Sequence, residues 1–573
     1  MKRLVGGLSI VFSFLFVEMA GAQVAPPPRT IADITALIDQ YKPDSAAADD
    51  ARATLDKTPP SGANDYDLAK YYLERVGAAA RLGDQVERLK AARAAGALAN
   101  VGNLAYRVTD EWANAEEQSG NLVESIRLRE RIRDLLTSAS GGRISANAVL
   151  ADTYAGLGDL AAGRRLLTDS EIMYRRLGHQ PIWEQNEIAL MERQRGDVQL
   201  REGKYAEAEA SYRKAFTAAD NDIEISRRRI ASGVSTPSQD VIVSMRNLRG
   251  EKLARTLLEQ GRVTDAEYYA RDVLRNALEW SGRSHPRTAA GLSLLGDVML
   301  AQGRFGEAEA LAKASLDSLS QAGVGGASIS IARTRARIAG TLVAQERWKD
   351  AIAQFERRDE GVGNDPALLR FLGAGNLDYG IALYHTGQFA RAAAMFDRVH
   401  GWWFANFGAS HLMSATTLAF GALARAGLGQ TQRALEELGV AFPVLAEQAR
   451  EHSDDRGGYL RALRFRWIAE GYLRLLAARA GAAGDPAAAE AAAEAFRIAD
   501  LARGSSVQRA VAASAARATI RDPQLAELAR REQDAGQRAG ALSEILSSVL
   551  ARPADQQLPK VIADMRQDRK SVV

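Results

Sequence analysis

The chain has 573 residues, long enough for several domains or for one extended array of repeats. Hydrophobic residues make up 46% of it but aromatic residues only 6%, a composition that favours helices over a large β-sheet. The net charge is +3 and no stretch concentrates Lys and Arg on one face, so nucleic acid is not a predicted partner. The absence of Cys excludes disulfides and thiol chemistry from these residues.

Residues 1–22 have the order of a Sec-type secretory signal peptide. The basic start MKR precedes the apolar run LVGGLSIVFSFLFV, and the small residues AGA precede Gln23. The apolar run is too short to span a bilayer comfortably, and no Cys follows it for a lipid anchor. We expect cleavage near Ala22 and Gln23 and a periplasmic or secreted protein. The alternative is an uncleaved signal segment, the only membrane attachment that the sequence predicts.

An internal repeat occupies residues 65–456, after a Pro-rich linker and an N-terminal helix over residues 23–64. Its clearest copy is LGDVMLAQGRFGEAEALAKASL, which contains Gly296, Gly303 and Ala308 in a phase that recurs along the chain. The expected turn positions of the copies are Gly83, Gly120, Gly158, Gly203, Gly261, Gly303, Gly387 and Gly429, with Glu346 in place of one Gly.

These segments resemble tetratricopeptide repeats, in which each unit is a helical hairpin. The resemblance implies an all-α fold, namely a right-handed superhelical solenoid. The turn-to-turn spacings after Gly261 are similar to those of the kinesin-light-chain style of the repeat. Gly at a turn accepts the left-handed backbone that ends a helix. Small residues let the two helices of a hairpin approach closely, whereas Leu295, Tyr212 and Phe396 are expected to fill the space between neighbouring hairpins.

A superhelix of this kind presents the first helix of each hairpin along a concave groove, which suits an extended peptide or a partner helix. We therefore predict a protein or peptide partner on the concave face. The residues expected to line the groove mix charges and sizes and do not reproduce the Lys/Asn clamp with which some relatives hold a C-terminal carboxylate. They are Arg193, Asp197, Arg201, Asp297 and Tyr384.

Other apparent sites have structural explanations. His285 and His411 each lie eighteen residues before a turn Gly, so both are expected at the start of a first helix; a metal site is the alternative, but no second ligand repeats with them. Trp402 and Trp403 are expected in a packed hinge between hairpins, with a partner groove as the alternative. No catalytic, cofactor-binding or metal-binding residue is predicted, and we expect no enzymatic activity from the chain as given.

Residues 457–567 differ in style and are expected to form further helical hairpins. The segments AFRIADLARGSSVQRAVAASAAR and ELARREQDAGQRAGALSEIL resemble the connector that joins the repeats of bacterial CHAT proteins to a caspase-like α/β domain. In that family the caspase-like domain supplies a His and a Cys as base and nucleophile. This chain has no Cys and no strand-rich stretch after Lys560, so no catalytic residue is carried over and the CHAT domain itself is missing.

The last six residues, 568–573, read DRKSVV, which resembles the translation of a sequencing adapter. We expect these residues to be non-native and the reading to be truncated before the CHAT domain; the alternative is a basic disordered tail. The predicted function is an exported interaction scaffold, the regulatory or binding part of a CHAT-domain protein, whose partner includes its own missing C-terminal domain. The alternatives are part of a caspase-like peptidase whose catalytic domain is missing here, or an envelope assembly or trafficking factor.

Overall fold

The computed structural model describes residues 45–503, apart from 137, 139, 178–179, 235–238, 366–367, 370–371, 374–375, 452–458 and 483–485, and isolated positions between 524 and 545. The chain divides into two units, residues 32–529 and residues 1–31 with 530–573, and every helix named below belongs to the first. The predicted signal peptide, the Pro-rich linker, most of the predicted connector and the DRKSVV tail lie outside the described residues.

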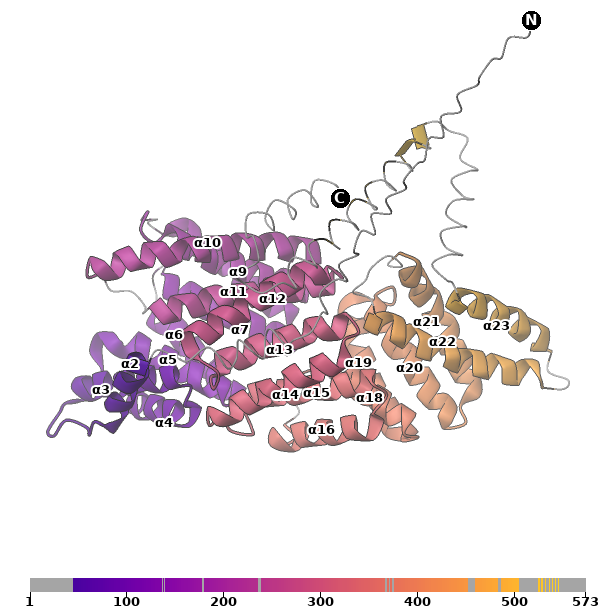
Figure 1. Cartoon of the computed structure of the whole chain (residues 1–573), viewed down its shortest axis with the longest axis horizontal. Helices are drawn as coiled ribbons and strands as arrows, with labels where there is room; N and C mark the ends of the chain where they lie inside the picture. Colours follow the sequence, from indigo (N-terminus) through magenta and orange to yellow (C-terminus); the bar gives the residue numbers. More distant parts are fainter. Residues whose placement is uncertain are drawn as a thin grey trace, which may run out of the picture. The chain divides into compact units, whose positions relative to one another are not determined.

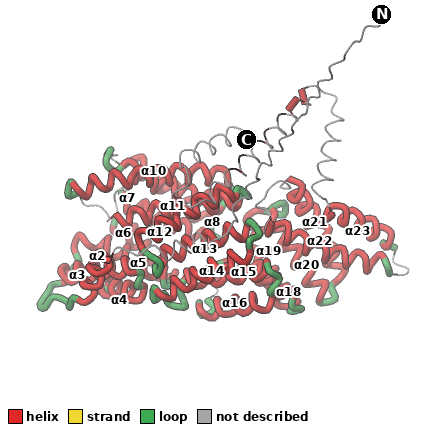
Figure 2. The backbone as a smooth tube through the Cα atoms, in the orientation of Figure 1, coloured by secondary structure: helices red, strands yellow, loops and turns green. Residues whose placement is uncertain are grey.

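The described residues form 21 α-helices and a short 3-10 helix, with no strand among them, so the predicted all-α fold is confirmed (Figure 2). The first ten α-helices are α2 (Ser45–Asp56), α3 (Asp65–Leu82), α4 (Gln85–Gly96), α5 (Ala105–Gln118), α6 (Leu122–Leu135), α7 (Gly141–Gly156), α8 (Leu160–Arg176), α9 (Glu184–Arg201), α10 (Tyr205–Ala231) and α11 (Gln239–Glu259), with the 3-10 helix η1 at Gly102–Leu104. The others are α12 (Val263–Ser281), α13 (Pro286–Ala301), α14 (Phe305–Gln321), α15 (Ile329–Ala344), α16 (Trp348–Gly361), α18 (Asn376–His385), α19 (Phe389–Phe407), α20 (Leu412–Gly427), α21 (Thr431–Glu451), α22 (Tyr459–Ala480) and α23 (Ala488–Arg503).

From α3 onward, consecutive helices pack in pairs to form hairpins, and each hairpin packs on the next, as α13 to α16 show (Figure 1). The term first helix denotes the leading member of each pair. The pairs are α3/α4, α5/α6, α7/α8, α9/α10, α11/α12, α13/α14, α15/α16, α18/α19, α20/α21 and α22/α23. A single hairpin leaves one apolar face exposed, and stacking buries that face against the neighbours.

The turns within the hairpins are where the repeat predicts them. All eight predicted turn glycines have positive φ, from 72° to 103°. At Gly303 the turn is closed by two backbone hydrogen bonds, from Gly303 N to Leu300 O (3.0 Å) and from Arg304 N to Met299 O (2.9 Å). This pattern satisfies carbonyls that would otherwise be left open at the helix end. Glu346 forms the same kind of turn with a φ of 60°, in the region that favours Gly.

Small residues in the first helices allow close approach within a hairpin, as predicted. A Cβ added at Gly196 would lie 2.8 Å from the ring of Tyr212, and one at Gly380 would lie 2.6 Å from the ring of Phe396. Both rings therefore lie over a Gly of their own hairpin, whereas their size predicted a position between hairpins. The reason is that the missing Cβ leaves a hole into which the facing aromatic side chain fits. Phe396 also stacks on Phe420 of the next hairpin, with ring centroids 5.6 Å apart.

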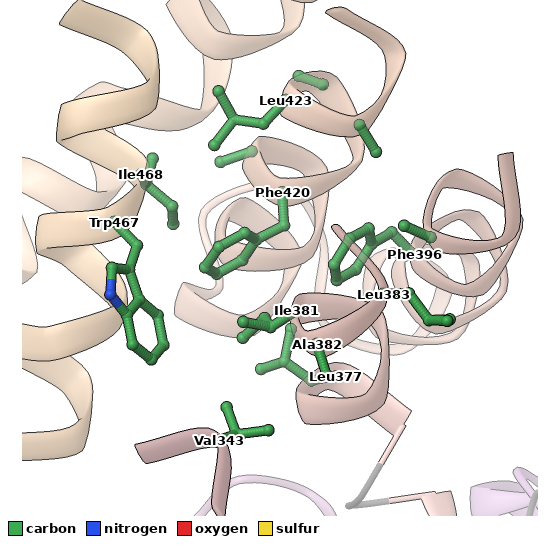
Figure 3. Close-up of a cluster of buried hydrophobic side chains, with 14 of the residues drawn as sticks. Val343, Leu377, Ile381, Ala382, Leu383, Phe396, Phe420, Leu423, Trp467 and Ile468 are labelled. Atoms are coloured by element: carbon green, nitrogen blue, oxygen red, sulfur yellow. The ribbon is translucent and has the colours of Figure 1, made fainter. Parts of the chain in front are cut away.

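A continuous apolar core runs through the C-terminal hairpins and includes side chains from α22. Trp467 and Ile468 on α22 face the side chains of Ile381 on α18 and Phe420 on α20 (Figure 3). Helix α22 approaches α20 closely, because a Cβ added at Gly471 would lie 2.7 Å from Leu423. Burial of large apolar side chains is the main stabilising term at this contact, at roughly 1.5–3 kcal/mol for each fully buried side chain.

Hairpins far apart in the chain also touch each other. The α3–α4 turn lies against the start of α13, where His285 Nε2 is 3.0 Å from Ala80 O. The α7–α8 turn lies against α19, where a Cβ added at Gly158 would be 3.1 Å from Trp402 Nε1. Each contact joins a hairpin to one several repeats later. The α3/α4 and α7/α8 hairpins are thus held by two sets of contacts, one to the next hairpin and one to a distant hairpin.

The aromatic segment HGWWFANFG is packed at the end of α19. The ring centroids of Trp402 and Trp403 are 4.8 Å apart, and Trp403 stacks on His411 at 5.0 Å. Because Trp402 contacts the α7–α8 turn at Gly158, the segment also joins hairpins that are distant in the chain. The hinge interpretation of the two Trp residues fits this packing.

Candidate partner-binding site

Four of the five predicted groove residues belong to two clusters of ion pairs on first helices, which together are called the network below. Arg193, Asp197 and Arg201 lie on α9, and Asp297 lies on α13. The fifth residue, Tyr384 at the end of α18, lies outside this network. That the five residues contact a partner stays a prediction. The structure shows that they are not equally accessible to solvent, since some are buried and others are partly exposed.

The first part of the network connects α7, α9 and α11. Arg201 Nη2 lies 2.9 Å from Asp152 Oδ1, and Lys252 Nζ lies 3.2 Å from Asp152 Oδ2. Lys252 Nζ also lies 3.1 Å from Asp197 Oδ1. A single ammonium group therefore connects carboxylates on two preceding first helices, which fixes the register of three consecutive hairpins.

Two of the predicted groove residues are internal. Asp197 is 1% exposed and Arg193 8% exposed, and the two side chains pair at 3.0 Å. Asp197 also accepts a hydrogen bond from the hydroxyl of Tyr212 at 2.7 Å. A carboxylate with all of these donors around it is satisfied within the fold. We infer that Arg193 and Asp197 position the more exposed side chains around them, and that those neighbours make any direct contact with a partner.

The second part of the network connects α11, α13 and α15. Asp297 lies between two guanidinium groups, with Arg255 Nη1 at 2.6 Å and Arg337 Nε at 2.9 Å. Arg255 also pairs with Glu251 on its own helix at 3.0 Å. The side chains of Arg255, Asp297 and Arg337 keep between 21% and 28% of their surface exposed, so solvent reaches this part of the network.

The charges in the network shift one another's protonation. Burial alone would raise the pKa of Asp152, but the nearby Lys252 and Arg201 outweigh burial and hold that pKa far below its ordinary value. The side chain of Arg333, on α15, is exposed, yet its pKa is lowered to about 10. Surrounding protein groups displace water from around Arg333, and the positive charges of Arg337 and other neighbours repel its own.

Tyr384 belongs to an aromatic cluster at the other end of the described array. Its ring lies 5.0 Å from His385, and His385 stacks on Trp348 with centroids 4.1 Å apart. Trp467 of α22 meets the edge of this pair, 5.3 Å from Trp348 and 5.5 Å from His385. This cluster is where α22 docks, so Tyr384 lies beside an intramolecular contact.

The two in-phase histidines occupy equivalent positions, as predicted. His285 Nδ1 accepts a hydrogen bond from the backbone N–H of Arg287 at 3.0 Å, and His411 Nδ1 accepts one from Met413 at 3.2 Å. Each histidine is the N-cap of a first helix. Among the residues that the structure describes, no group of three or more His, Asp or Glu side chains could hold a metal ion.

Most of the residues in the network were not predicted as functional, although the repeat phase contains a signal for them. Residues six positions before a turn Gly are charged in four consecutive hairpins, and they are Asp152, Asp197, Arg255 and Asp297. At the same position, α18 and α20, which share an apolar core with α22, have Ile381 and Leu423 instead. Comparing one position across the repeats would have identified both the charged and the apolar region.

The comparisons with known proteins agree with this repeat architecture. Residues 244–321 match the family model of the tetratricopeptide repeat. No curated protein sequence matches the chain. A tetratricopeptide-repeat region is therefore present, as predicted, and such repeats indicate a protein–protein interaction scaffold. The repeat fold is in general not catalytic, which is consistent with the prediction of no enzymatic activity.

Three of the solved structures that match the chain share little sequence identity with it. The Rap protein complexed with competence and sporulation factor has a TM-score of 0.44 at 11% identity, covering 69% of this chain and 98% of that chain. The tetratricopeptide domain of P58(IPK) has a TM-score of 0.20 at 11% identity, covering 76% of this chain and 99% of that chain. The Cut9–Hcn1 hetero-tetramer has a TM-score of 0.21 at 14% identity, covering 82% and 96%.

In the part of the chain that the structure describes, no helix is both long enough and apolar enough to cross a membrane.

Proposed function

We propose that this chain is an exported tetratricopeptide scaffold that binds a protein or peptide partner along its first helices, on the concave face of the solenoid. The observation that carries the proposal is the row of charged side chains on α7, α9, α11, α13 and α15. These side chains form two ion-pair clusters, and those of Arg201, Arg255, Asp297 and Arg337 remain accessible to solvent. A series of neighbouring helices that presents accessible charged groups suits recognition of an extended polypeptide.

The export part of the proposal rests on the signal-like residues 1–22. Expression of the gene with these residues in a bacterial host, followed by fractionation and N-terminal sequencing, tests it. We expect the mature protein in the periplasm or the medium, beginning at Gln23. Recovery of a cytoplasmic protein that still carries Met1 would contradict export.

The second part of the proposal is that the chain is the regulatory or binding region of a CHAT-domain protein, with that caspase-like domain as one partner. Its support is the resemblance of the segment after residue 495 to the CHAT connector. Extension of the genomic reading frame beyond codon 567 tests it. We expect further α/β sequence that contains a His and a Cys, and a stop codon directly after codon 567 would contradict it.

The partner-binding role itself is tested by photo-crosslinking. A photoreactive amino acid replaces Arg333, which is exposed on first helix α15, or, as a matched control, Arg228, which is exposed on second helix α10. We expect a covalent adduct with a defined partner from position 333 and none from position 228. Equal labelling from both positions, or none from either, would contradict a partner on the first helices.

A further inference from the structure

The surfaces of the first helices differ along the array. In the C-terminal hairpins, the apolar side chains of α18 and α20, among them Ile381 and Leu423, are covered by α22 and buried. In the four hairpins that begin with α7, α9, α11 and α13, the corresponding position is charged, and several side chains around it keep part of their surface in contact with water. The chain's own helix thus occupies the apolar region, and the charged region is the part whose chemistry can select a partner.

The charged region has more positive than negative groups at its accessible positions. Two carboxylates are each shared between two cations: Asp152 between Arg201 and Lys252, and Asp297 between Arg255 and Arg337. One carboxylate neutralises only one unit of positive charge, so each of these clusters retains a net positive charge unless a further carboxylate joins it. Glu251 supplies one such group to Arg255, so the Asp297 cluster is balanced. The Asp152 cluster keeps the excess, because its two carboxylates, Asp152 and Asp197, face the three cations of Arg193, Arg201 and Lys252.

Arg333 adds a further positive charge between these clusters. Its side chain is exposed, and the charges of Arg337, Arg255 and Arg201 all act on it. Displacement of water by the surrounding protein is the largest cause that lowers the pKa of Arg333 to about 10; repulsion by the three arginines lowers it further, and Asp152 opposes the shift. A carboxylate placed beside Arg333 would offset part of this repulsion and could form charge-assisted hydrogen bonds with the planar guanidinium group.

We propose that this charged region, defined by Arg201, Lys252, Arg255, Arg333 and Arg337, binds an extended polypeptide segment that carries acidic side chains. The inference deepens the proposed function, since it names the partner chemistry at the same first helices. Carboxylates of the protein alternate with the cations, as at Asp152 and Asp297. This alternation suits a polypeptide with spaced acidic residues, because the continuous negative charge of a nucleic-acid backbone would face these carboxylates at every step.

The test measures binding to the full chain by fluorescence anisotropy, with labelled peptides of defined composition. One peptide alternates Glu with Ser and Gly, a second replaces every Glu by Gln, and a third replaces every Glu by Lys; a single-stranded oligonucleotide is the fourth probe. We expect the Glu peptide to bind at least about tenfold more tightly than the Gln peptide, and to weaken as salt rises. We expect the Lys peptide and the oligonucleotide to bind no better than the Gln peptide.

Two charge-reversed variants locate the site. Arg333→Glu should weaken the Glu peptide at least about tenfold, because it replaces an attractive charge by a repulsive one. Arg228→Glu makes the same change on the exposed side of α10 and should leave affinity within about twofold. Circular dichroism of both variants shows whether their helices are intact, and Arg333→Gln is a milder variant in case Arg333→Glu loses helicity.

The outcomes separate the two levels of the proposal. Tight binding of the Gln or Lys peptide, with no effect of the Arg333 variants, would overturn acidic selectivity and leave a peptide-binding scaffold. Preferential binding of the oligonucleotide would overturn the assignment of a polypeptide. If no probe binds, the proposal that the region recognises an acidic segment is overturned. A partner crosslinked at position 333 would then still support the proposed function.

Discussion

Trp467 Nε1 donates a hydrogen bond to Glu346 Oε1 across 3.4 Å and thereby connects α22 to the α15–α16 turn, 121 residues earlier in the chain. Arg466 Nη2 lies 3.3 Å from the same carboxylate oxygen. Glu346 stands where the other turns have Gly, and its φ of 60° is costly for a residue with a Cβ. The contacts explain this residue choice, because only a side chain can reach α22 from the turn.

Replacement of Glu346 by Gly should separate the global and local roles of this residue. Gly removes the strain of a left-handed backbone, which stabilises the fold by about 1 kcal/mol. The half-exposed ion pair and the long hydrogen bond that are lost contribute about the same free energy or less. We expect Glu346→Gly to leave the melting temperature unchanged or slightly raised, while hydrogen exchange in α22 becomes faster. Differential scanning fluorimetry and hydrogen-exchange mass spectrometry measure the two effects.

The control for this experiment is Glu346→Gln, which retains the strained backbone and removes the charge. It should accelerate exchange in α22 without the compensating gain in melting temperature. Unchanged exchange in α22 in both variants would mean that the apolar contacts of Trp467 and Ile468 hold the helix without the carboxylate.

Neutralisation of Asp297 should destabilise the array and make its stability depend more on salt. The carboxylate lies between Arg255 and Arg337, and Asp297→Asn would leave these two guanidinium groups facing each other. Because the site is partly exposed, we expect a loss of about 1–3 kcal/mol, part of which added salt restores. Asp317→Asn on α14, where the side chain is exposed, is the matched control and should change stability by less than about 0.5 kcal/mol. Equal losses in chemical denaturation of the two variants would contradict a role for the shared carboxylate.

Local signals were sufficient to predict the hairpins but not their distant contacts. The turn glycines, the small residues of the first helices and the capping histidines depend on neighbours within one repeat, so the sequence pattern alone locates them. The partner of Glu346 and the position of α22 depend on the way the whole array is stacked. The same holds for Lys252, whose carboxylate partner Asp152 is 100 residues away. Tyr212 was expected between hairpins because its size was considered without the hole that Gly196 leaves opposite it.

A methyl group added at Gly120 should disrupt the contact between the α5–α6 turn and the start of the α15 hairpin. Gly120 has a φ of 93°, and an added Cβ would lie less than 3.0 Å from the backbone oxygen of Ala327. Gly62 also has positive φ, 71°, but nothing lies within 4 Å of an added Cβ. We expect Gly62→Ala to cost about 1 kcal/mol from backbone strain alone, and Gly120→Ala to cost about 2–4 kcal/mol because the clash is added. Similar midpoints for the two variants in urea denaturation would show that the contact with Ala327 can shift to admit a methyl group without lowering the free energy of unfolding.

Acid should weaken the docking of α22 through His385. The ring stacks on Trp348 and meets Trp467, and its Nε2 is buried with no hydrogen-bond partner among the described residues. Burial lowers the pKa of His385 to about 4; Glu346 opposes this shift and Arg474 adds to it. In the unfolded chain the pKa is about 6.5, so below that pH the unfolded state takes up the proton first and stability falls until about pH 4. Above about pH 7 the group contributes no pH dependence.

The variant His385→Phe isolates this effect, because Phe keeps an aromatic ring in the stack but cannot be protonated. Since the His385 site is partly solvated, we expect the wild type to lose about 1–3 kcal/mol more than His385→Phe when the pH falls from about 7.5 to about 4.5. Carboxylates titrate in both proteins, so their contribution cancels in the difference. Hydrogen exchange in α22 should follow the same difference, faster in the wild type at the lower pH. Parallel pH profiles for the two proteins would show that the protonated imidazole is accommodated without separating α22 from Trp348.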